Sequence, residues 1–168
     1  MEIESFLLGE NGWVPNNTRL PVVVYRGALE CDGDDLACRF EALFDDHGWT
    51  PAWRDDVFDY RHYHSTAHEA LGVFAGEATL ELGGSGGRDV FVAAGDALML
   101  PTGTGHRAVS ASEDFRVVGA YPQGQNWDIC RGAPNDAARA RMEALPDPKR
   151  DPVTGAAGAG TDARPRLS

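Results

Sequence analysis

Basic residues are scarce in this chain of 168 amino acids. Lysine and arginine number 15 against 26 aspartates and glutamates, which gives a formal net charge of −11. A nucleic-acid partner needs a basic surface that neutralises phosphates, and an anionic membrane surface attracts basic segments in the same way. We therefore expect no nucleic acid and no membrane as partner, and we expect the acidic charge to keep the domain in solution.

Long apolar runs and paired cysteines are also lacking. No apolar run approaches the roughly 20 residues of a membrane-spanning helix, and the opening MEIESFLLGENG places acids before a short apolar patch, unlike a secretory signal. The three cysteines, Cys31, Cys38 and Cys130, are odd in number and have no CxxC spacing, which indicates reduced thiols rather than a disulfide framework or a zinc ribbon. These features predict a cytoplasmic protein.

The first quarter of the chain predicts an extended arm followed by a helix. Residues 1–30 form the predicted arm, and PVVVYRGAL at 21–29 has the β-branched and aromatic content of a strand. Leu36, Phe40, Leu43 and Phe44 then recur at the spacing of one helix face, which predicts a helix near 34–46. We assign this helix to a barrel domain that spans 31–130.

From residue 57 onward, short β-runs alternate with glycine-rich breaks such as GGSGGR and TGTG. This pattern is typical of an all-β antiparallel sandwich or barrel. Residues 131–168 are rich in Pro, Gly and Ala, so we expect a C-terminal extension that is partly flexible, with a short helix at 135–146 capped by Asn135 or Asp136. The predicted strands cover 57–64, 68–75, 77–82, 89–93, 97–101, 106–110 and 115–121.

Three of the five histidines lie in HYHSTAHE, residues 62–69. On a strand, alternate residues share a face, so His62 and His64 point the same way and form the start of a transition-metal site. An unbroken strand would place His68 on that face as well. A turn or bulge at STA would instead turn Glu69 inward. The local sequence leaves both alternatives open.

Two groups of residues recur at regular spacings. His62, His64, Glu69 and Gly76 follow H-x-H-x3-4-E-x6-G, and Gly95, Pro101, Gly103 and His106 follow G-x5-P-x-G-x2-H. These two groups resemble the paired motifs of the cupin superfamily. The leading glycine of the first motif is absent, and Ser110 replaces the final asparagine of the second. The chain also resembles small single-domain bacterial cupins whose function is uncharacterised, and this closer resemblance implies no particular reaction.

The resemblance implies a double-stranded β-helix, or jelly-roll barrel, with a metal inside it. Its ligands would be His62, His64, Glu69 and His106, with His68 beside the site in the second layer or as an alternative ligand. Three imidazoles and a carboxylate suit one divalent transition metal, Fe, Mn, Ni, Co or Zn, and not calcium or magnesium, which prefer oxygen. The resemblance also implies a homodimer, with residues 1–30 at the interface.

Two functions are compatible with these residues. The first is a metal-dependent enzyme, of oxygenase or isomerase type, that acts on a small organic substrate. The second is a non-catalytic, metal-stabilised protein that binds or senses a small molecule. A second titratable residue facing the metal would favour the enzyme, and Tyr60, which shares the parity of His62 and His64, is the candidate for it together with His68. The catalytic residues themselves stay unassigned.

Overall fold

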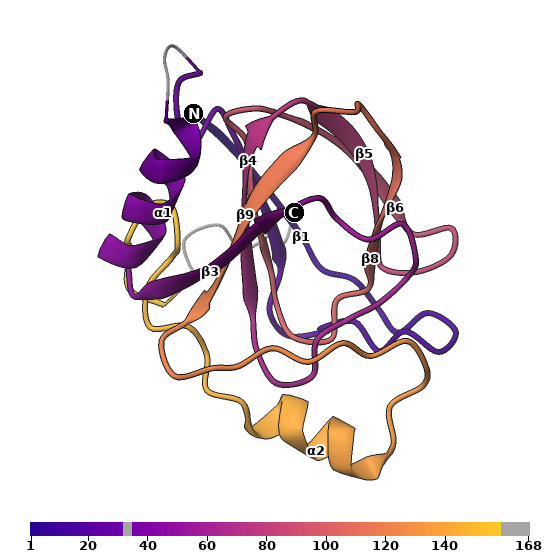
Figure 1. Cartoon of the computed structure of the whole chain (residues 1–168). Coiled ribbons are helices and arrows are strands. Elements are labelled where there is room, and N and C mark those ends of the chain that lie inside the picture. Colours follow the sequence, from indigo (N-terminus) through magenta and orange to yellow (C-terminus); the bar gives the residue numbers. More distant parts are fainter. Residues whose placement is uncertain (32–34, 159–168) are drawn as a thin grey trace.

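The computed structural model describes residues 1–31 and 35–158. Two antiparallel sheets face each other and enclose a barrel (Figure 1); the larger has the strand order β1-β2-β7-β4-β9-β3 and the smaller the order β6-β5-β8. This architecture confirms the predicted all-β class. The strands are β1 (Glu2–Phe6), β2 (Val22–Arg26), β3 (Trp49–Asp55), β4 (Glu69–Ala75), β5 (Glu77–Leu82), β6 (Arg88–Ala93), β7 (Ala97–Leu100), β8 (His106–Ala111) and β9 (Arg116–Pro122).

The predicted runs from residue 68 onward correspond to β4–β9, with ends that differ by about one residue. The predicted strand at 57–64 is wrong. The regular strand, β3, lies earlier and carries Pro51, which fits there because β3 is an edge strand whose outer side needs no ladder hydrogen bond. Residues 57–64 form a connection that is held by two isolated bridges, His62 with His106 and Tyr63 with Cys130.

Two apolar layers fix the larger sheet between the barrel interior and a helix. The inner layer fills the space between the sheets with Val, Leu and Phe side chains. The outer layer packs α1 (Leu36–Asp46) against the other face (Figure 1). Phe40 of α1 lies directly on Gly72 of β4, where an added Cβ would come within 2.5 Å of the ring. The absence of a side chain at Gly72 therefore lets the helix approach the sheet closely.

The C-terminal part of the chain runs back along the barrel. Helix α2 (Asp136–Ala144) begins at Asn135, whose side chain accepts a hydrogen bond from the Ala138 amide at 2.8 Å. Further on, the buried Asp151 accepts a 2.5 Å hydrogen bond from the Tyr25 hydroxyl of β2. Residues 145–158 are thus attached to the sheet, while residues 159–168 of the predicted flexible tail and residue 34 of the predicted helix lie outside the described residues.

The helices of the described segments are short: neither is long and apolar enough to cross a membrane.

Candidate metal centre

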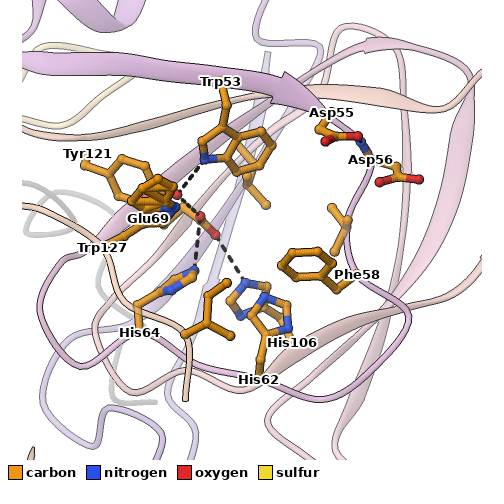
Figure 2. A pocket seen from close by; sticks show the side chains of 13 residues that line it. Trp53, Asp55, Asp56, Phe58, His62, His64, Glu69, His106, Tyr121 and Trp127 are labelled. Carbon is orange, nitrogen blue, oxygen red and sulfur yellow. Dashed lines mark hydrogen bonds and ion pairs between the residues drawn. The ribbon is translucent and has the colours of Figure 1, made fainter. Parts of the chain in front are cut away.

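Three imidazoles meet inside the barrel. His62 and His64 come from the connection before β4, and His106 is the first residue of β8. Reciprocal main-chain hydrogen bonds between His62 and His106, at 2.9 and 3.3 Å, bring the two segments together. One ring nitrogen from each of the three histidines lies within 4.8 Å of the others, and all three side chains are buried (Figure 2).

Main-chain carbonyls fix the protonation of each ring. Nδ1 of His62 contacts the Tyr60 carbonyl at 3.0 Å, Nδ1 of His106 contacts the Thr104 carbonyl at 2.9 Å, and Nδ1 of His64 contacts the Asp128 carbonyl. A carbonyl only accepts hydrogen bonds, so each Nδ1 must carry the proton. The three Nε2 atoms of the neutral rings are therefore bare acceptors, which is the usual orientation of metal-binding histidines.

Glu69 places its carboxylate among these acceptors. Its Oε2 lies 3.2 Å from Nε2 of His64, and its Oε1 lies 3.2 Å from Nε2 of His106. Nε2 of His64 is buried and has no hydrogen-bond partner. Lone pairs and a buried negative charge that face one another are unfavourable unless a positive charge lies between them. The Nε2 atoms and the carboxylate therefore fit the role of ligands to a bound cation.

The pKa values of the histidines and Glu69 also indicate that the site favours a positive charge beside the carboxylate. Burial and the neighbouring His106 and His64 lower the pKa of His62 to about 3, so this ring is neutral and free to bind. Burial acts against a charged His64, but the Glu69 charge outweighs it and raises the pKa of that ring. Burial likewise acts against ionised Glu69, yet its histidine neighbours hold its pKa well below the usual range. A proton on His64 can thus take the place of a cation.

A cavity of about 250 Å³ opens above the four side chains. Figure 2 shows it from close by, with the histidines and Glu69 on one side and aromatic rings around them. Most of the lining is apolar. The full set is Trp53, Asp55, Asp56, Val57, Phe58, His62, His64, Glu69, Leu71, His106, Tyr121, Trp127 and Ile129.

Two residues that the sequence did not single out control the position of Glu69. The Tyr121 hydroxyl donates a 2.7 Å hydrogen bond to Oε2 of Glu69, and Nε1 of Trp53 donates to the same hydroxyl at 2.8 Å (Figure 2). The Trp53 ring lies on Gly119 of β9, where a Cβ would come within 2.3 Å of it. Alternation along β9 placed Tyr121 on the face of Val117, which is in the inner core, so the sequence did contain a signal for it.

A further residue was missed without any local signal. Asp128 lies in the long connection after β9, and its carbonyl orients His64 while its carboxylate accepts a 2.6 Å hydrogen bond from the Ser65 amide. Trp127 beside it lines the cavity and lies 5.4 Å from the Tyr121 ring. Tyr121 and Trp127 of the segment at 121–128 therefore form part of the cavity wall.

His68 lies outside this cluster. Its Nδ1 accepts a 3.0 Å hydrogen bond from the Thr102 amide, and its Nε2 contacts the Pro146 carbonyl at 3.1 Å. Burial lowers the pKa of His68 to about 4. Of the two alternatives that the sequence left open, the structure turns Glu69 toward the histidines and His68 toward the C-terminal segment.

The Tyr60 side chain does not line the cavity, contrary to the expectation from parity. Its ring stacks on Phe58 at 4.7 Å, and the Arg131 guanidinium lies 3.8 Å from its centre on another side. The parity argument failed because residues 57–64 are not a regular strand. Tyr60 contributes through its carbonyl, which fixes the His62 ring.

Comparison with known proteins identifies the family. Residues 56–120 match the model of the cupin domain. Over 156 residues, the chain is 38% identical to a protein of Bacillus subtilis (strain 168) that is named Uncharacterized protein YjlB, and the match covers 92% of each chain. The chain is a cupin.

Solved structures resemble this cupin loosely. Procruciferin, an 11S globulin from Brassica napus, aligns with a TM-score of 0.37 and 18% identity over 67% of this chain and 23% of its own. A DUF861 family protein of Thermotoga maritima aligns with a TM-score of 0.35 and 18% identity over 52% and 92% of the two chains. Streptomyces albus HEPD, solved with 2-hydroxyethylphosphonate and Fe(II), has a TM-score of 0.30 at 14% identity over 76% of this cupin and 21% of HEPD. Similarity of this size carries no information about activity.

Proposed function

We propose that this cupin binds one divalent transition metal through His62, His64, Glu69 and His106 and is a metal-dependent enzyme that acts on a small organic substrate. The observation that carries the proposal is the tautomer of the three rings. Each Nδ1–H is bound to a main-chain carbonyl, so three bare Nε2 atoms and one carboxylate share a buried space that opens into a cavity.

The types of ligand atom restrict which metal ions can bind. Three nitrogen atoms and a carboxylate suit Fe, Mn, Ni, Co or Zn rather than calcium or magnesium. When bound, such an ion supplies a Lewis acid and, if it is redox-active, a centre for oxygen chemistry. Oxygenase and isomerase reactions are both compatible with that chemistry.

The side chains of the chain itself would hold the substrate and shield it. Trp53, Phe58 and Trp127 give the cavity apolar walls that exclude water from the reacting atoms. The Tyr121 hydroxyl donates a hydrogen bond to Glu69 and so orients the carboxylate that shares the site. The hydroxyl of Tyr121 is also the polar group of the wall that is closest to Glu69, which makes it the place where a proton could be held.

Metal content tests the proposal directly. Wild-type protein and His64→Ala would be expressed in metal-replete medium and measured by elemental analysis, with His47→Ala as the matched control because the His47 ring binds the Pro152 carbonyl, away from the site. We expect about one ion per chain in wild type and His47→Ala, and a large loss in His64→Ala. Equal, near-zero content in all three proteins would refute the proposal.

A second candidate function is a non-catalytic protein that binds or senses a small molecule. It is favoured by the shortage of general bases in the lining of the described chain. Beyond the four proposed ligands, the titratable groups of that lining are Asp55 and Asp56, which are exposed, and Tyr121, which is engaged with Glu69. Saturable ligand binding without any turnover by the metal-loaded protein would select this function.

We also propose a cytoplasmic homodimer formed through residues 1–30. β1 is an edge strand of the larger sheet, and the exposed Ile3 and Leu7 lie on or beside it, which makes this edge suited to pairing with a second chain. The three cysteines are free, as expected in a reducing compartment. Sedimentation of a monomer at micromolar concentration would refute the dimer.

A further inference from the structure

The lining of the cavity in the described chain carries carboxylates but neither lysine nor arginine. Glu69 lies on the floor, and Asp55 and Asp56 line the mouth at the end of β3. No lysine or arginine belongs to the lining within residues 1–31 and 35–158. A divalent cation on the floor would still leave these three carboxylates with one negative charge in excess.

The arginines nearest in sequence are engaged elsewhere. Arg61 and Arg107 both bind Glu81, at 2.7 and 3.2 Å. Arg54 binds a carboxylate of α1 at 2.6 Å, and Arg131 lies over an aromatic ring outside the lining. A negatively charged ligand would therefore meet carboxylates at the mouth and no compensating guanidinium along the wall, which disfavours its entry.

Asp55 and Asp56 are available to a ligand. Both are exposed, and the ion pairs among the described residues include neither of them. Asp55 accepts a hydrogen bond from the Asp56 amide at 2.8 Å. Exposed acids alone would signify no more than a solvated strand end. Here the two carboxylates line an enclosed cavity together with the aromatic rings of Trp53, Phe58 and Trp127, and this cavity is the second feature that points to a ligand.

The walls between floor and mouth are aromatic. Trp53, Phe58 and Trp127 all line the cavity (Figure 2). Aromatic faces pack against the apolar body of a ligand, and where they border the mouth they also attract an organic cation, tryptophan most strongly. The volume of about 250 Å³ is below the usual 300–1,000 Å³ of sites for drug-sized ligands, so the ligand must be small.

We propose that the cavity selects a small organic cation, an apolar or aromatic body that carries one ammonium group. The ammonium lies at the mouth beside Asp55 and Asp56, and the body lies between the aromatic walls and reaches toward the histidines. The inference deepens the proposed function, on which it rests for the role of the floor.

Three matched probes test the charge preference: phenethylamine, phenethyl alcohol and hydrocinnamate, which are cationic, neutral and anionic at about pH 7. Each is titrated into the metal-loaded, full-length protein at low ionic strength, and binding is followed by quenching of tryptophan fluorescence, because Trp53 and Trp127 line the cavity. We expect the amine to bind about tenfold more tightly than the alcohol, and the alcohol more tightly than the carboxylate.

The double variant Asp55→Asn/Asp56→Asn tests whether the two carboxylates at the mouth cause the preference for the amine over the alcohol. It should weaken amine binding about fivefold and leave alcohol binding unchanged. Asp59→Asn is the matched control, since Asp59 is exposed nearby but does not line the cavity, and it should change neither affinity. Carboxylate binding as tight as amine binding, no saturable amine binding, or an equal loss in Asp59→Asn would each overturn the proposal.

Metal analysis of the same samples keeps the two proposals separate. Wild-type protein without bound metal refutes the proposed function. The preference for the amine over the alcohol is measured independently, and its absence in a metal-loaded protein refutes only the ligand class.

Discussion

The Tyr121 hydroxyl lies 2.7 Å from Oε2 of Glu69 and donates a hydrogen bond to it. This oxygen is also the one that lies 3.2 Å from Nε2 of His64. A side chain of β9 thus sets the direction of the single carboxylate among the proposed ligands. The relationship leads to the first prediction.

Tyr121→Phe should weaken metal binding roughly tenfold, because partners that orient metal ligands typically contribute ten- to hundredfold to affinity. The dissociation constant is measured by competition with a chelator. Tyr63→Phe is the control, since Tyr63 is equally buried but donates to the Gly132 carbonyl instead. Equal affinities of the two variants would show that the hydroxyl at Tyr121 does not support the site.

Glu69→Gln and His68→Asn separate the two candidates for the ligand that follows the STA break. Glu69→Gln removes the negative charge that faces the histidines, so bound metal should be lost on dialysis. His68→Asn keeps an acceptor for the Thr102 amide and should retain about one ion per chain. Elemental analysis gives both values, and the opposite pattern would make His68 the ligand.

Gly119→Ala should displace Trp53, which forms part of the cavity wall. The new methyl group would come within 2.3 Å of the Trp53 ring and push it away from the Tyr121 hydroxyl. Overpacking of this kind costs about 1–3 kcal/mol, so urea unfolding should show a matching loss, together with a shift in tryptophan emission. Gly9→Ala is the control, because its Cβ would meet nothing within 4 Å; indistinguishable variants would contradict the close packing of Trp53.

The stability of the fold should decline on acidification because His68 is buried as a neutral ring. Its pKa falls from 6.5 to about 4 in the folded chain, so between these values the unfolded chain binds a proton that the folded chain does not. The contribution is fully present above about pH 6.5 and is lost as pH falls toward 4; at 1.36 kcal/mol per pKa unit it amounts to roughly 3 kcal/mol.

His68→Asn removes this titration. We expect the free energy of unfolding of the metal-free variant to fall less than that of the metal-free wild type over the same pH range. Urea unfolding at a series of pH values gives the comparison, and parallel curves for the two proteins would refute the role of His68.

Much of the barrel could be predicted because the local pattern and the tertiary pairing agree. β5 alternates apolar residues between turns, and Gly76 before it adopts a positive φ of 69°, as a tight strand connection requires. The proposed ligands were predicted from the resemblance of their two motifs to those of the cupin superfamily, whereas the local sequence left the choice between Glu69 and His68 open. Residues 57–64 misled the prediction because their β-like composition supports an extended connection without a ladder.

The parts of the site that escaped prediction depend on long-range contacts. Tyr121 meets Glu69 across 52 positions and Asp128 meets His64 across 64, and no local pattern encodes such pairings. The role of His68 was equally hidden, because its partner Pro146 belongs to the C-terminal extension. Sequence periodicity predicts which face a side chain occupies but not which distant segment it meets.

The orientation of the three imidazoles rests on backbone oxygens of Tyr60, Thr104 and Asp128. No side-chain replacement at these positions removes a carbonyl, so point mutation leaves this layer of the site intact unless it moves the main chain. The walls at Trp53, Phe58 and Trp127, in contrast, are made of side chains that a point mutation replaces directly. The cavity can therefore drift toward new ligands by single substitutions while the arrangement of the histidines is inherited unchanged, which makes this barrel a favourable starting point for directed evolution of specificity.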